Sequence, residues 1–131
     1  MRVVLDTNVL IAAFATRGIC EDVLRTVLAE HQLVASKFIL DELERVLNDK
    51  LKMPAARVRE LTAFIRQTAL IVKPKDPATW PASDPDDQWI VATALCGEAQ
   101  ILVSGDRDLQ NAPGNIPIEI LTPREFWERL K

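Results

Sequence analysis

Hydrophobic positions along the chain fall into two patterns, short apolar runs and longer helical stripes. The short runs are rich in β-branched residues and apolar on both faces, which is typical of buried strands in a parallel sheet. Pro117 falls within the last of these runs and favours an edge strand, because proline cannot donate a ladder hydrogen bond. The predicted strands cover residues 3–5, 32–35, 70–72, 100–103 and 116–121.

Helical patterns separate these runs. In residues 37–47, for example, Ile39, Leu40, Leu43, Val46 and Leu47 form one apolar stripe after Ser36, a good N-cap. Strands that alternate with helices predict an α/β layered fold with a mainly parallel sheet. The other predicted helices start directly after Asp6, cover 21–30 and 55–69, run from Pro85 to Leu95, and run from Pro123 to the C-terminus.

Composition narrows the class of protein. A length of 131 residues, 48% of them hydrophobic, predicts one folded domain spanning 1–131. The net charge of −3 excludes a global basic field, so a polyanionic partner needs a local patch or bound cations. No run is long enough to span a membrane and no signal peptide is recognised, so we expect a cytoplasmic protein. Cys20 and Cys96 lie in apolar patterns and are interpreted as reduced core residues.

Acidic residues crowd one helix start. Ser83-Asp84-Pro85-Asp86-Asp87 precedes the apolar pattern 88–95. An aspartate cap followed by proline explains one acid, because it satisfies free N–H groups at the positive end of the helix dipole. Three acids exceed what capping requires, since like charges repel at this distance. Asp84 is interpreted first as the N-cap, whereas Asp86 and Asp87 remain open as functional acids.

Further carboxylates are placed to join this cluster. Asp6 and Asp106 each follow an apolar run, and functional groups of parallel sheets gather beyond the carboxyl ends of strands. Glu42 lies at the edge of its helix's apolar stripe, between core and solvent. Together with Asp87, these acids would repel one another unless protons or cations offset their charge. Magnesium suits such oxygen ligands, and it can activate water for attack on a phosphoryl group.

The same residues carry a family resemblance. Residues 3–10 (VVLDTNVL), the Glu42 helix, residues 87–94 (DQWIVATA) and residues 102–106 (LVSGD) resemble, in order, the motifs of PIN-domain nucleases. The ending ILTPREF at 120–126 resembles members identified as toxins of toxin–antitoxin pairs.

The resemblance implies a three-layer α/β/α sandwich and a Mg²⁺- or Mn²⁺-dependent ribonuclease. It also implies an RNA substrate, a small antitoxin partner and a homodimer. The metal-site acids would be Asp6, Glu42, Asp87 and Asp106, with Asn8 and Ser104 orienting the cluster or the substrate. Asp87 is preferred over Asp84 and Asp86 by the motif spacing.

Other functions remain possible from the residues. A receiver-type phosphoryl-binding module would place a lysine just after a late strand, and Ser104-Gly105-Asp106 offers none. A haloacid-dehalogenase-type phosphatase would place a second acid two residues after the first, where Asn8 stands. A third alternative is a PIN-like module that binds RNA or a partner without catalysis. The cations Lys50, Lys52, Arg57 and Arg59 either contact RNA phosphates or form a solvated helix face.

Overall fold

The fold is built on one parallel sheet. A computed structural model describes residues 1–80, 84–111 and 116–130. Its five strands lie in the order β3-β2-β1-β4-β5, and every neighbouring pair is parallel. The chain therefore builds outward from β1 to β3 and then returns to β4 on the other side of β1. The strands are β1 (Arg2–Leu5), β2 (Gln32–Ser36), β3 (Leu70–Val72), β4 (Ile101–Val103) and β5 (Glu119–Leu121).

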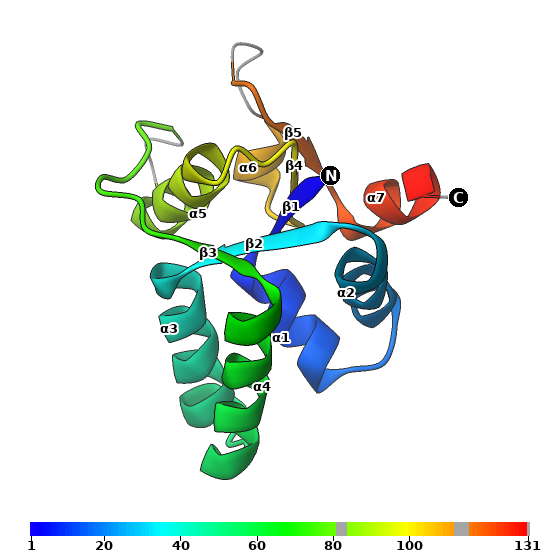
Figure 1. The fold of residues 1–131 in the computed structure, drawn as a ribbon, viewed down its shortest axis with the longest axis vertical. Helices are drawn as coiled ribbons and strands as arrows, with labels where there is room; N and C mark the ends of the chain where they lie inside the picture. The colour runs from blue at the N-terminus through cyan, green and yellow to red at the C-terminus, as the bar shows by residue number, and fades with distance from the viewer. Residues whose placement is uncertain (81–83, 112–115, 131) are drawn as a thin grey trace.

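Helices cover both faces of this sheet, which confirms the predicted α/β class. In Figure 1, α5 and α6 lie on the opposite side of the sheet from α1 to α4, while α7 packs beside α2. The helices are α1 (Thr7–Ala15), α2 (Ile19–Glu30), α3 (Lys37–Arg45), α4 (Ala55–Thr68), α5 (Pro85–Cys96), α6 (Arg107–Gln110) and α7 (Pro123–Leu130). A π-helix, η1 (Val46–Lys50), continues α3.

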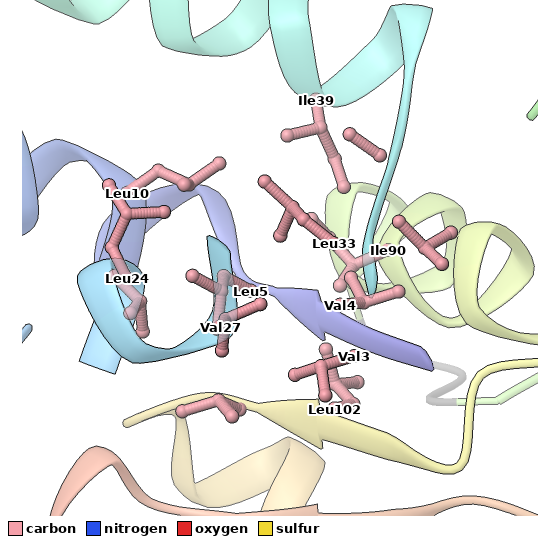
Figure 2. Packing of buried hydrophobic residues seen from close by; sticks show 14 of the residues in the cluster. Val3, Val4, Leu5, Leu10, Leu24, Val27, Leu33, Ile39, Ile90 and Leu102 are labelled. Atoms are coloured by element: carbon pink, nitrogen blue, oxygen red, sulfur yellow. The ribbon is translucent and has the colours of Figure 1, made fainter. Parts of the chain in front are cut away.

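The hydrophobic core lies on both sides of β1. Val3, Val4 and Leu5 are fully buried, as expected for a central strand covered on both faces. Figure 2 shows Leu5 beside Val27 of α2 and Val4 facing Ile90 of α5, because successive side chains of a strand point to opposite faces. The apolar run that predicted the first strand thus also fixes the central position of β1.

Local sequence signals set several helix starts. The Ser36 hydroxyl accepts a 3.3 Å hydrogen bond from the Ile39 N–H at the start of α3. At the start of α7, the Thr122 N–H donates to the Glu125 carboxylate at 2.9 Å and the Glu125 N–H donates to Thr122 Oγ1 at 3.0 Å. This reciprocal pair is a capping box. Both starts were predicted from the sequence.

Some predicted boundaries were wrong. The predicted fifth strand, 116–121, is shorter, because β5 pairs only from Glu119 and Pro117 lies before it. The helix predicted from Lys37 to Leu47 or a little beyond is present, but it is an α-helix only to Arg45 and continues as η1 to Lys50. A π-helical turn forms i to i+5 hydrogen bonds, and the Leu51 N–H accordingly donates to the Val46 carbonyl at 3.1 Å. Side-chain periodicity does not reveal such a turn.

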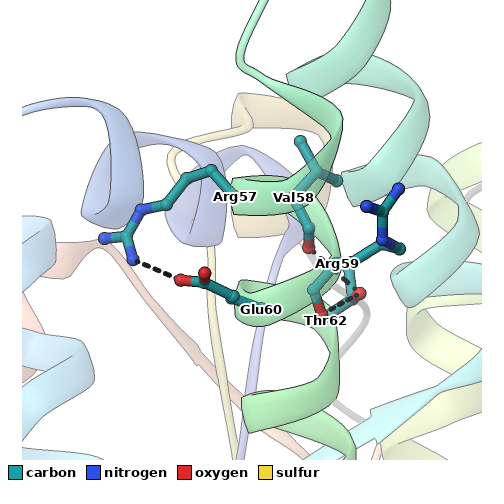
Figure 3. A network of polar contacts seen from close by, with 5 residues as sticks. All are labelled: Arg57, Val58, Arg59, Glu60 and Thr62. Carbon is teal, nitrogen blue, oxygen red and sulfur yellow. Dashed lines mark hydrogen bonds and ion pairs between the residues drawn. The ribbon is translucent and has the colours of Figure 1, made fainter.

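The basic residues near α4 do not form one patch. Figure 3 shows Arg57 and Arg59 on opposite sides of α4, and Arg57 forms an exposed ion pair with Glu60 at 3.3 Å. Arg57 lines a hollow beside α1 and α2, whereas Lys50 lines the acidic cavity described below. These cations therefore do not form a shared phosphate-binding face.

The two cysteines are less buried than the sequence predicted. Cys96 is exposed and Cys20 only half-buried, so the prediction that both are core residues was wrong. Each lies near an end of its helix, where an apolar neighbour in sequence does not guarantee burial. Within the ranges that the structure describes, no helix combines the length and apolar character needed to cross a membrane.

Candidate metal centre

The acidic residues gather where the strand order reverses. Strands β1 and β4 pair directly, with Leu5 opposite Val103, and the Asp6 N–H donates to the Val103 carbonyl at 2.9 Å. Asp6 directly follows β1, and Asp106 is the third residue after β4. The crevice beyond such a pair of strands is where α/β sheets bind ligands. The predicted convergence of Asp6 and Asp106 is thus confirmed.

Ser104 ties these two acids together. Its hydroxyl donates a 2.7 Å hydrogen bond to Asp6 Oδ2 and accepts a 3.0 Å bond from the Asp106 N–H. Ser104 is fully buried beneath the cluster. Burial raises the pKa of Asp6, and the hydrogen bond from Ser104 partly opposes that rise. Ser104 therefore orients Asp6 and favours its charged form.

Asp84 and Asp87 lie together at the start of α5. Asp84 is the N-cap, and its Oδ1 accepts hydrogen bonds from the N–H groups of Asp86 at 3.0 Å and Asp87 at 3.4 Å. The predicted cap, with Pro85 in the first turn, is thus present. Asp87 is only 6% exposed, and its buried Oδ2 has no hydrogen-bond partner among the described residues. Such an orphaned acceptor needs a proton donor or a cation.

Three of these carboxylates could share one ion. Oxygen atoms of Asp84, Asp87 and Asp106 all lie within 4.8 Å of one another. Burial raises the pKa of Asp87 to about 8, and the adjacent Asp106 carboxyl acts in the same direction. The cluster therefore holds its negative charge at a cost that a bound cation would remove.

Glu42 and Asp86 form another part of the acidic lining. Burial raises the pKa of Glu42, the neighbouring Thr7 hydroxyl opposes this, and the charges of Asp86 and Asp6 raise it further. Glu42 projects from α3, at the boundary between core and solvent that its sequence position predicted. The fold thus brings a carboxylate from α3 into the same field as those after β1 and β4.

The acids line one cavity of about 210 Å³. Of the eight residues singled out from the sequence, Ser104 lies behind the cavity and does not line it. The lining includes Asp6, Asn8, Glu42, Asp84, Asp86, Asp87 and Asp106. The sequence left open whether Asp84, Asp86 or Asp87 belongs to the acidic cluster. In the structure Asp84 caps α5 and also lies in the cluster with Asp87.

Sequence reasoning missed two features of this lining. Arg45 also lines the cavity, as does Lys50 at the end of η1. Arg45 stands three residues after Glu42 and so shares its helix face, a signal that the spacing could have given. Lys50 reaches the cavity through the π-helical turn, which no sequence pattern indicated.

The donor set suits a hard divalent cation. Among the described residues, the cavity lining offers carboxylate oxygens from separate segments, a buried Asp87 oxygen without a hydrogen-bond partner, and no histidine or cysteine, which matches the preference of Mg²⁺ or Mn²⁺. The two cysteines lie elsewhere, on α2 and at the end of α5. The geometry therefore fits a carboxylate-bound ion.

The chain is similar to known proteins in sequence and in fold. A family model described as "PIN domain" matches residues 2–108. No curated protein matches the sequence. Among solved structures, a chain of VapBC2 from Rickettsia felis, solved with a promoter DNA fragment, is 14% identical with a TM-score of 0.68, covering 93% of this chain and 98% of that one.

Two further solved structures are similar over nearly their whole length. A chain of VapBC-1 from nontypeable Haemophilus influenzae is 17% identical with a TM-score of 0.68, covering 95% of this chain and 99% of that one. A chain of a toxin–antitoxin complex from Klebsiella pneumoniae is 22% identical with a TM-score of 0.66, covering 92% of this chain and 97% of that one. At these identities the likeness concerns the fold.

Proposed function

The chain belongs to the PIN domain family, and from this premise we propose that it is a metal-dependent endoribonuclease. The observation that carries the proposal is the cluster of Asp84, Asp87 and Asp106 oxygens within 4.8 Å of one another, together with a buried Asp87 oxygen that has no hydrogen-bond partner among the described residues. The proposed substrate is RNA, cleaved at phosphodiester bonds in the cytoplasm. Residues 1–131 would act as one domain.

The carboxylates around the cavity are the proposed metal-site and catalytic acids. Asp6, Glu42, Asp87 and Asp106 would hold Mg²⁺ or Mn²⁺, and Asp84 joins them through its position in the cluster. When bound, such an ion activates water and neutralises charge that builds on the phosphoryl group. The carboxylates themselves fix the position of that chemistry at the junction of β1 and β4.

Neighbouring polar groups keep these acids in place. Ser104 holds Asp6 through its hydroxyl and the Asp106 backbone through its oxygen, so both acids keep one orientation. Asn8 lines the cavity from the first turn of α1, where its amide can donate a hydrogen bond to a phosphate oxygen. Arg45 adds a positive charge to the same cavity, which lowers the repulsion between the acids and an RNA strand.

A pair of variants on α3 tests the function. Glu42→Gln removes a charge inside the cavity, whereas Glu44→Gln changes an exposed acid on the same helix. With purified protein and labelled RNA, we expect Mg²⁺- or Mn²⁺-dependent cleavage that EDTA abolishes. Glu42→Gln should lower the cleavage rate on the order of 100-fold, the scale for losing one preorganised electrostatic group. Glu44→Gln should cleave like wild type. An equal loss of cleavage rate in both variants, or cleavage that continues in EDTA, would contradict the proposal.

The proposed partner is a small antitoxin protein. Support comes from the similar structures, which include VapBC-1 and a toxin–antitoxin complex. The protein would then act as the toxin of such a pair and form a homodimer. Co-expression with the product of the gene immediately upstream should yield a complex with inhibited RNA cleavage, and light scattering should give the mass of two chains. A protein that is monomeric and does not bind the product of the upstream gene would contradict both the antitoxin partner and the homodimer.

A further inference from the structure

A second hollow lies beside the acidic cavity. It has a volume of about 340 Å³ and lies between α3, α5 and the residues that follow β3. Half-buried Phe38 and Trp89 contribute aromatic surface, and Val72 and Pro74 contribute aliphatic surface. The two rings lie nearly parallel, with centroids 6.2 Å apart and an interplanar angle of 24°. We call this hollow the aromatic slot.

The aromatic slot continues into the acidic cavity. A third hollow, of about 270 Å³, is lined by Phe38, Asp41, Glu42, Arg45 and Asp86. It shares Phe38 and Asp41 with the aromatic slot, and Glu42, Arg45 and Asp86 with the acidic cavity. A chain molecule bound at the acids can therefore extend past Arg45 to the aromatic rings.

We propose that the aromatic slot binds an unpaired nucleobase of the RNA strand and that Arg45 contacts the phosphate between this base and the cleaved bond. This inference rests on the proposed ribonuclease function and names a substrate feature, single-stranded RNA. Base stacking on aromatic side chains is the general way in which proteins hold single strands without reading their sequence.

The ring geometry defines how the base binds. Ring planes that enclose a third ring must stand about 7 Å apart, because carbon atoms in contact lie about 3.5 Å apart. The centroids of Phe38 and Trp89 are closer than that, at 6.2 Å. The base therefore stacks on the slot-facing side of the aromatic pair and extends the stack, with Val72 and Pro74 beside it.

The charges along this path suit a nucleic acid strand. Arg45, between the slot and the acids, has no carboxylate within ion-pair distance among the described residues, and the same holds for Lys73 in the slot. Lys37, also in the slot, is paired with Asp41 at 2.7 Å. Arg45 and Lys73, which form no ion pair with a described residue, lie beside the aromatic surface, and this arrangement matches a phosphate–base–phosphate repeat.

The test combines a protein variant with a modified RNA. Trp89→Leu keeps an apolar side chain and removes the aromatic face, and Phe64→Ala, an exposed aromatic on α4 outside the path, is the control. Each is combined with Glu42→Gln to slow cleavage of the RNA during the measurement. Binding of labelled single-stranded RNA is measured by fluorescence anisotropy in Mg²⁺, with abasic nucleotides scanned along the oligonucleotide.

The expected result is a coupling between the base and Trp89. Trp89→Leu should weaken RNA binding roughly 5- to 100-fold, the range for losing one base–aromatic stack. At one position in the oligonucleotide, an abasic nucleotide should lower the RNA affinity of the protein that retains Trp89 by a similar factor. The same abasic nucleotide should leave the RNA affinity of the Trp89→Leu protein almost unchanged. Phe64→Ala should bind like its parent. Arg45→Gln should weaken binding and reduce its salt dependence, because one phosphate contact is lost.

Other outcomes overturn the slot without touching the proposed function. If each abasic nucleotide lowers the RNA affinity of both proteins by the same factor, no base occupies the aromatic slot. If Trp89→Leu leaves RNA binding unchanged but converts a dimer to a monomer by light scattering, the slot is an interface between two copies. Circular dichroism establishes that the variants fold. Failure of the proposed function appears separately, as absent metal-dependent cleavage by the otherwise wild-type protein.

Discussion

Replacing Asp87 with asparagine should stabilise the metal-free protein while removing its activity. Asp87 is 6% exposed beside Asp106, and one of its oxygens is buried without a hydrogen-bond partner in the part of the chain that the structure describes. Burial and the neighbouring carboxyls raise its pKa from the ordinary 3.8 to about 8. Ionised Asp87 is therefore strained in the fold, and the neutral amide of asparagine has a similar shape without the charge.

The sign of the effect follows from proton binding. Between about pH 4 and pH 8, folded Asp87 holds a proton that the unfolded chain has released, so the free energy of unfolding falls as pH rises through this window. The pKa change from 3.8 to about 8 corresponds to about 5 to 6 kcal/mol at most, at about 1.4 kcal/mol per tenfold change in proton affinity. Because relaxation of the cavity and entry of water reduce the cost of a buried charge below this limit, we expect a gain of about 2 to 3 kcal/mol for Asp87→Asn at pH 8.5.

Urea unfolding in EDTA at several pH values between 4.5 and 8.5 measures this gain. The advantage of Asp87→Asn should grow with pH, and Mn²⁺ should then stabilise wild type more than the variant, because the ion binds the ionised cluster. Asp76→Asn, at an exposed position between β3 and α5, is the control and should show no such trend. An advantage that is absent at pH 8.5, or equally large at pH 4.5, would refute the reasoning.

Three further substitutions test the framework around the site. Ser104→Ala removes the 2.7 Å hydrogen bond to Asp6 and should cost about 1 to 3 kcal/mol, with kcat reduced more than KM; unchanged cleavage would exclude a positioning role. Gly97→Ala should lower the free energy of unfolding by about 1 to 3 kcal/mol in urea, because the new Cβ would lie 2.5 Å from Val34 Cγ1; a neutral effect would show that the strand yields. Phe126→Ala empties a fully buried site in α7 and should cost about 3 to 5 kcal/mol in the same assay; a loss below about 1 kcal/mol would mean that α7 contributes little to the core.

The pattern of apolar runs was sufficient to predict much of the framework. Strands in which every residue is apolar must be covered on both faces, so Val3, Val4 and Leu5 predicted a central parallel strand. Parallel strands end at one edge of the sheet, so Asp6 and Asp106 could be expected to meet. Local capping chemistry likewise predicted the starts of α3, α5 and α7.

Other properties depend on contacts between distant segments. From the sequence, capping and metal binding were alternative roles for Asp84. A carboxylate has two oxygens, however, and packing where the strand order reverses lets Asp84 cap α5 and also lie in the acidic cluster. The π-helical turn that carries Lys50 to the cavity conserves the helical pattern, so periodicity could not reveal it. The functional role of each acid stays a prediction until cleavage is measured.

The sequence by itself determined which residues are apolar, which can cap a helix and which carry charge, because these are properties of single side chains and near neighbours. Only the tertiary structure decided that Phe38 and Trp89 share a slot, and that this slot opens toward the acids through Arg45. The physical reason is that α3 and α5 meet across the end of the sheet. That meeting is set by how the whole core packs, and no local stretch of the chain encodes it.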